Sequence, residues 1–153
     1  MKKRLVLASL ILAGAFAAPA AFAGETLPDP LAALESGKKS FETACSKCHK
    51  LDLPLSRKLD RAGWEGILGA MTARGGSFAP AERALIVDYL VVKSTFETKC
   101  STCHGTQNAL AAQRSREEWG KTVKRMAEKS PQAFTPQEID LIIAYLTLAV
   151  GSN

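Results

Sequence analysis

The chain has 153 residues and a formal charge of +5, with 46% hydrophobic and 23% charged residues. These values are typical of a globular protein, and they exclude a chain that is disordered or membrane-embedded over its whole length. A single large catalytic domain is not expected at this length.

Residues 1–23 have the three parts of a secretory signal peptide. Residues 2–4 are cationic, residues 5–16 are apolar, and small residues then lead to an A-x-A cleavage site that ends at Ala23. We therefore expect cleavage after Ala23 and a periplasmic mature protein. An uncleaved N-terminal anchor is the alternative, but Pro19 and the small residues favour cleavage.

Cleavage would remove three cations and lower the formal charge from +5 to +2. So small an excess of positive charge does not predict a nucleic-acid partner. The longest later apolar stretch, residues 139–150, contains Asp140 and is too short to cross a bilayer. We expect no integral membrane span in the mature chain.

The cysteines and histidines of the chain fall into two identical motifs. C-x-x-C-H is the attachment signature of c-type haem, in which two thiols bond to the porphyrin and the adjacent imidazole binds the iron. Every cysteine and every histidine is used in these motifs: Cys45, Cys48 and His49 in the first, and Cys100, Cys103 and His104 in the second. The sequence therefore predicts two covalently bound haem c groups.

Three other uses of four cysteines are weaker. An exported chain often forms disulfides. A thioredoxin-like redox pair would have one motif in a βαβ setting. A four-thiolate zinc site usually has its two pairs closer together than Cys48 and Cys100. None of these explains why a histidine follows each pair.

The surroundings of the motifs repeat as well. The first register is 55 residues, and after one inserted residue it becomes 56. This pattern predicts an internal duplication into two units, residues 31–92 and 93–153. Pairs in the first register are Phe41 and Phe96, Arg61 and Arg116, Trp64 and Trp119, and Met71 and Met126; pairs in the second are Phe78 and Phe134, Pro80 and Pro136, Glu82 and Glu138, Tyr89 and Tyr145, and Leu90 and Leu146.

Each unit is too small to bury a large core, so we expect haem to act as the centre of each core and the haem-free chain to fold poorly. No Gly, Pro or Ser-rich linker separates the units. A helical pattern runs from Ala81 almost directly into Cys100. We expect the units to pack closely and to share, or nearly share, a helix.

The periodicity predicts an all-α fold. Asp60 can cap a helix that carries Trp64 and Met71 on one face, and Ser115 with Glu118 predicts a capped helix at the matching place in the second unit. Residues 135–138, Thr-Pro-Gln-Glu, have the same kind of start signal for the last helix. No segment alternates like a strand.

Counting residues limits the candidates for the sixth ligand of each iron. No third histidine or fifth cysteine exists, and the only methionines after the signal peptide are Met71 and Met126, each 22 residues beyond its haem histidine. A methionine at helical spacing from a tryptophan can be core filler. Because two irons each lack a ligand, we predict that Met71 and Met126 are axial ligands; lysine, water or an open position are the alternatives.

With its two motifs, the chain resembles a tandem of class I c-type cytochrome domains and is similar to cytochrome modules found with bacterial periplasmic dehydrogenases. The resemblance covers nearly all of the mature chain. It rests on C-x-x-C-H, on Phe41 and Phe96 one turn earlier, and on a closing Tyr-Leu helix. It implies that the first and last helices of a unit cross through a small residue and aromatics. Gly37, Phe41 and Tyr89 fit this crossing in the first unit, whereas Val92 stands at the glycine position of the second.

These patterns predict an electron carrier and not an enzyme. A His/Met ligand set raises the reduction potential relative to bis-His and leaves no open site on iron. Expected partners are redox proteins: a dehydrogenase, an oxidase or another cytochrome. One alternative is a cytochrome subunit of a periplasmic dehydrogenase complex. Another is a haem enzyme, such as a peroxidase or a thiosulfate-oxidising cytochrome.

Overall fold

The computed structural model describes residues 29–151, and the predicted signal peptide lies outside them. Within this range every regular element is a helix, so the all-α prediction is confirmed. The helices are α1 (Pro30–Cys45), α2 (Asp52–Leu55), α3 (Arg61–Ala73), α4 (Pro80–Cys100), α5 (Gln107–Leu110), α6 (Arg116–Ala127) and α7 (Pro136–Val150).

The predicted helix starts are confirmed by their hydrogen bonds. The Asp60 carboxylate accepts from Gly63 N–H at the start of α3. Ser115 forms a reciprocal capping box with Glu118 at the start of α6. Residues 135–138 form the same motif at the start of α7. Each cap satisfies backbone N–H groups that a helix cannot pair internally.

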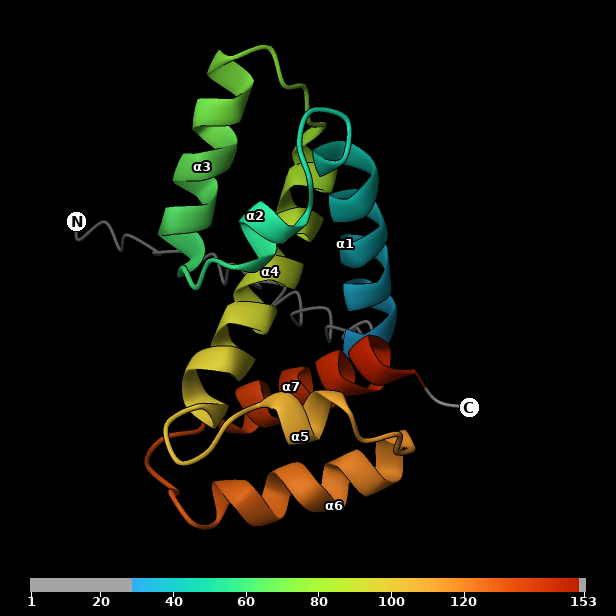
Figure 1. Cartoon of the computed structure of the whole chain (residues 1–153), viewed down its shortest axis with the longest axis vertical. Coiled ribbons are helices and arrows are strands. Elements are labelled where there is room, and N and C mark those ends of the chain that lie inside the picture. Colours follow the sequence, from blue (N-terminus) through green and yellow to red (C-terminus); the bar gives the residue numbers. More distant parts are fainter. Residues whose placement is uncertain (1–28, 152–153) are drawn as a thin grey trace, which may run out of the picture.

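Helix α4 is the longest element and runs without a break through residues 92 and 93, where the sequence places the end of one predicted unit and the start of the next. Figure 1 shows α1 and α3 beside one half of α4, and α5, α6 and α7 grouped around its other end. Helix α1 packs against both α4 and α7. The helix pair α1 and α7 therefore meets on α4, and the two halves share one core.

The closest approach in this core is at Gly37 of α1. A Cβ atom there would lie 2.5 Å from the Leu85 carbonyl oxygen and 2.9 Å from Tyr89 Cβ on α4. Neither distance is possible for a real side chain, so only glycine permits this crossing. Gly37, Phe41 and Tyr89 do meet where α1 crosses α4, as the sequence resemblance implied.

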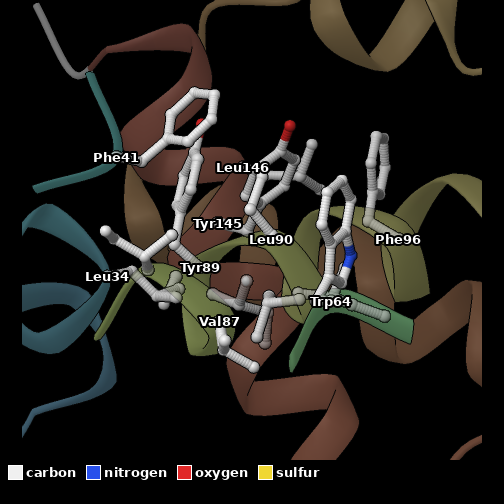
Figure 2. Packing of buried hydrophobic residues seen from close by; sticks show 14 of the residues in the cluster. Leu34, Phe41, Trp64, Val87, Tyr89, Leu90, Phe96, Tyr145 and Leu146 are labelled. Atoms are coloured by element: carbon white, nitrogen blue, oxygen red, sulfur yellow. The ribbon is translucent and has the colours of Figure 1, made fainter. Parts of the chain in front are cut away.

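Four aromatic rings form a chain of contacts across the core, and all four residues are labelled in Figure 2. Phe41 lies 5.7 Å from Tyr89, Tyr89 lies 6.2 Å from Tyr145, and Tyr145 lies 5.3 Å from Phe96, between ring centroids. These spacings lie within the range of about 4.5–7 Å over which aromatic rings attract one another. This chain of contacts joins the turn before the first motif to the turn before the second.

An ion pair also joins the start of α1 to the start of α6. Arg116 at the start of α6 donates two hydrogen bonds to the Asp29 carboxylate, at 2.7 and 2.9 Å, where Asp29 caps α1. The guanidinium lowers the pKa of Asp29. Its repeat partner Arg61 instead pairs with Asp88 on α4. Among residues 29–151, no helix is long and apolar enough to span a membrane.

Candidate functional site

Both C-x-x-C-H motifs lie at the end of a helix. Helix α1 ends at Cys45 and α4 ends at Cys100, and in each case the next residue is a serine whose N–H donates to a glutamate carbonyl four residues earlier. The rest of each motif forms a turn beyond the helix. The second cysteine is exposed in both motifs, whereas the first is partly buried. All four cysteines are free thiols.

The two histidines make the same backbone contact. Nδ1 of His49 lies 3.1 Å from the carbonyl oxygen of Lys50, and Nδ1 of His104 lies 3.1 Å from the carbonyl oxygen of Gly105. Because a carbonyl oxygen can only accept, Nδ1 is the donor in this contact, and Nε2 is the nitrogen that remains available to a ligand. A metal-binding histidine commonly donates its other ring N–H to a carbonyl in this way. The contact of each imidazole with a backbone carbonyl is therefore compatible with an iron ligand that binds through Nε2.

The first motif opens into a cleft, which we call the first cleft. It encloses 230 Å³, and a neighbouring hollow of 440 Å³ shares Cys45, His49 and Met71 with it. Its wall is largely apolar and comes from α2, α3 and α4. The residues that matter here are Cys45, His49, Pro54, Trp64, Leu68, Met71, Phe78 and Leu90.

The second motif opens into a matching second cleft of 190 Å³. This volume is below that of most ligand pockets, about 300–1,000 Å³, so a bound macrocycle would also extend into the open side where His104 is exposed. Its wall includes Phe96, Cys100, His104, Ala109, Trp119, Met126, Phe134 and Leu146. The structure thus places Met71 in a cleft with His49, and Met126 in a cleft with His104.

Six pairs of repeated residues occupy the two clefts in parallel. In each pair, one member lines the first cleft and the other, 55 or 56 residues later, lines the second. The pairs are Cys45 and Cys100, His49 and His104, Trp64 and Trp119, Met71 and Met126, Phe78 and Phe134, and Leu90 and Leu146.

The two tryptophans differ in their polar contacts. Both are almost completely buried, at 1% and 2% exposed. Trp64 Nε1 donates to Ser94 Oγ on α4 at 3.2 Å. Trp119 Nε1 has no hydrogen-bond partner within the part of the chain that the structure describes. A buried donor without a partner destabilises the fold, so the tryptophan of the second cleft is less favourably placed than that of the first.

Each cleft also carries two arginines, and they are not repeat partners. Arg57 and Arg74 line the first cleft. Arg114 and Arg125 line the second, where Arg114 lies over the Trp119 ring at 5.2 Å and donates to Thr122 Oγ1 at 2.6 Å. Guanidinium groups are well suited to bind carboxylates, such as the two propionates of a haem.

Burial raises the pKa of the first thiol of each motif, Cys45 and Cys100. For Cys45 the nearby Glu82 carboxylate adds to the effect of burial, and for Cys100 burial alone is responsible. Both thiols are therefore protonated at neutral pH, which makes them weak nucleophiles. This environment does not favour a thiolate redox pair.

The residues of both clefts fit a covalently attached haem. Each cleft combines the first cysteine of a motif at a helix end, a histidine, a methionine, an apolar aromatic wall and two arginines. Within residues 29–151, no group of three or more His, Cys, Asp or Glu side chains is placed to hold a metal ion.

Several site residues were not predicted from the sequence. The short helices α2 and α5 form one wall of each cleft, and the arginines lie at places that the repeat does not mark. The second register of the repeat pairs Phe78 with Phe134 and Leu90 with Leu146, and this pairing is the sequence signal for these four cleft residues.

Comparison of the chain with protein-family models, with curated proteins and with solved structures found no match.

Proposed function

We propose that this chain is a dihaem c-type cytochrome that carries single electrons between redox proteins in the periplasm, after cleavage of the signal peptide behind Ala23. The observation that carries the proposal is the pair of matched clefts. In each cleft a histidine with a free Nε2 and a methionine line one apolar space beside a cysteine at a helix end.

In the first site, Cys45 and Cys48 would hold the haem covalently, and His49 and Met71 would bind its iron. In the second site, Cys100, Cys103, His104 and Met126 would have the same roles. When bound, each haem supplies an iron that gains and loses one electron between Fe(III) and Fe(II). Closed six-coordinate iron favours electron transfer over catalysis.

The protein residues limit contact between the iron and water. Trp64, Leu68 and Leu90 are buried around the first cleft, and Trp119 and Leu146 around the second. An apolar wall destabilises the more highly charged Fe(III) form, which raises the reduction potential.

The geometry also supports fast exchange between the two sites. Leu90 lines the first cleft and Phe96 lines the second, and both belong to α4. Six residues of helix advance by about 9 Å, so the two clefts open beside the same short stretch of α4. One electron could therefore enter at one haem and leave at the other.

The first test is the mass and haem content of the exported protein. We expect two haems per chain, attached through the four cysteines. Replacing both cysteines of one motif by alanine should remove one haem and leave the other attached. A native chain with no added mass would end the proposal.

The second test addresses the methionines. In the oxidised protein, the near-infrared sulfur-to-iron charge-transfer band should lose part of its intensity in Met71→Ala and in Met126→Ala, and all of it in the double variant. Full intensity in both single variants would show that neither methionine binds iron.

A cytochrome subunit of a periplasmic dehydrogenase is the second candidate, and it would be purified together with a catalytic chain. A peroxidase is the third. It requires an iron that releases its sixth ligand, and measurable turnover of peroxide by the reduced protein would favour it over a pure carrier.

A further inference from the structure

Two adjacent polar residues are buried in the middle of α4. Lys93 and Ser94 are each only 4% exposed. Burying a lysine or serine side chain costs free energy unless it is fully hydrogen-bonded, so the hydrogen-bond partners of these two residues indicate their structural role. Both bind a segment that belongs to the wall of the first cleft.

Ser94 holds two groups at once. Its hydroxyl oxygen accepts from Trp64 Nε1 at 3.2 Å and from Leu59 N–H at 3.3 Å. Leu59 directly precedes the Asp60 cap of α3, and Trp64 is in the first turns of α3. Ser94 therefore fixes the N-terminal end of α3 on α4.

Lys93 holds the preceding part of the same segment. Its ammonium group donates to the Leu55 carbonyl at the end of α2 and to the Glu97 carboxylate at 2.7 Å. Leu55 follows Pro54, a buried residue of the first cleft. We call Lys93 and Ser94 together the α4 clasp.

The second half of the chain has no equivalent of this clasp. The residues 56 positions later are Ala149 and Val150, which have no polar side-chain group. Accordingly, Trp119 Nε1 has no partner within residues 29–151. The residue 55 positions before Lys93 is Lys38, which pairs with Glu42 at 3.7 Å on the surface of α1. Lys93 forms the same kind of pair with Glu97, but inside the molecule.

The difference follows from the two roles of α4. Helix α1 begins the first predicted unit, and the second half of α4 begins the second, so each carries a Lys-Glu pair at the same repeat position. Helix α4 also forms part of the wall of the first cleft, and it therefore packs against α3 on a further face. In α4 the same pair is covered by the segment from α2 to α3.

We propose that Lys93 and Ser94 are positioning residues for the first haem site, although they lie only seven and six residues before Cys100 of the second motif. This inference rests on the proposed function. The clasp sets where Trp64 and the start of α3 lie, and Met71 is two turns beyond Trp64 on the same face. The ligand geometry of the first iron thus depends on the helix to which the second haem is attached.

The test compares the two haems in holoprotein variants. Ser94→Val copies Val150, Lys93→Met removes the ammonium group, and Ser94→Thr keeps a hydroxyl. Thr95→Val is the matched control, because Thr95 is next on α4 and makes no side-chain hydrogen bond within the described range. Lys38→Met is the control for Lys93→Met. The readouts are the reduction potential of each haem and the upfield methyl signal of each axial methionine, assigned with Met71→Ala and Met126→Ala.

We expect Ser94→Val and Lys93→Met to shift the potential and the methionine signal of the first haem, and to leave those of the second haem at their native values. Ser94→Thr should restore the native values, and both controls should match the native protein. A change confined to the second haem, or native values in both clasp variants, would overturn the proposal.

One measurement on the unmodified protein makes the test independent of variant folding. The Leu59 amide should exchange its hydrogen at least about tenfold more slowly than the amide of Arg114, its repeat partner, whose N–H has no hydrogen bond within residues 29–151. Equal exchange rates would contradict the clasp. A protein that lacks two haems by mass refutes the proposed function; a protein with two haems and an unresponsive first site refutes the clasp alone.

Discussion

The clefts of the two halves share six pairs of identical side chains, yet α3 and α6 are held in different ways. Helix α3 is tied to α4 through the Trp64 indole and the Ser94 hydroxyl. Helix α6 has no such hydrogen bond within residues 29–151, and its Trp119 indole instead lies under the Arg114 guanidinium. The repeated residues thus define what lines a cleft, whereas the neighbouring helix decides how firmly the wall is fixed. Helix α4 lines both clefts, whereas α7 lines only the second.

The largest effect is expected where α1 crosses α4. Gly37→Val copies Val92 of the second half and places a side chain 2.5 Å from the Leu85 carbonyl oxygen. The backbone cannot move away without separating the helices, so we expect a loss of about 3 kcal/mol in the free energy of unfolding. Thermal unfolding of the holoprotein measures it.

Gly66 is the control for this substitution. It lies on the exposed side of α3, and a Cβ there would meet nothing within 4 Å. Gly66→Ala should stabilise the protein by about 0.5–1 kcal/mol. Equal effects of the two glycine substitutions would show that the α1–α4 crossing is not as close as described.

The second effect concerns the tryptophans. Trp64→Phe and Trp119→Phe remove the same atoms from equally buried positions, but only Trp64 loses a hydrogen bond. Trp64→Phe should therefore cost about 1 kcal/mol more than Trp119→Phe. Denaturant unfolding of both variants provides the comparison, and a greater cost for Trp119→Phe would mean that its indole is paired after all.

A third comparison exchanges helix caps. Thr135 accepts from Glu138 N–H at the start of α7, whereas Ala79 stands at the matching position of α4 and has no side-chain acceptor. Ala79→Thr should stabilise the protein by about 1 kcal/mol and Thr135→Ala should destabilise it by about 1 kcal/mol. The double variant should unfold close to the native midpoint, because distant sites add. A clear departure from additivity would show that the two helix starts are coupled.

The smallest effect at neutral pH is that of Tyr89→Phe. The Tyr89 hydroxyl has no hydrogen-bond partner within residues 29–151, so little is lost at pH 7. Burial raises the pKa of Tyr89 to about 12, and the Glu42 and Glu97 carboxylates add to this. In the unfolded chain the pKa is about 10, so the unfolded state loses its proton first as the pH rises.

The native protein should therefore lose stability between about pH 10 and pH 12, and Tyr89→Phe should lose less of it over the same interval. Urea unfolding at pH 7, 10 and 11 tests this. Burial also raises the pKa of Tyr145, so Tyr145→Phe should behave alike. Parallel pH profiles for the native and both variant proteins would contradict the effect.

Much of the site could be predicted because it depends on local spacing. A cap three residues before Gly63 predicts the start of α3, and helical periodicity then puts Trp64 and Met71 on one face. The same reasoning places Trp119 and Met126 on α6. These side chains do line the clefts beside the histidines.

The short helices α2 and α5 could not be predicted in this way. Each has four residues, too few to show a period, and is held by its position over a cleft more than by its own sequence. The burial of Lys93 was equally hidden, since a Lys-Glu pair four residues apart is normally exposed, as Lys38 and Glu42 are.

Local sequence patterns were enough to predict the all-helical architecture, the starts of α3, α6 and α7, and the side chains that share a face with each methionine. These features need only contacts between residues a few positions apart. The tertiary structure alone decided which tryptophan is hydrogen-bonded, which lysine is buried and which arginine crosses from α6 to α1. Those outcomes depend on which distant segment covers a helix face, and that is a property of the whole folded chain.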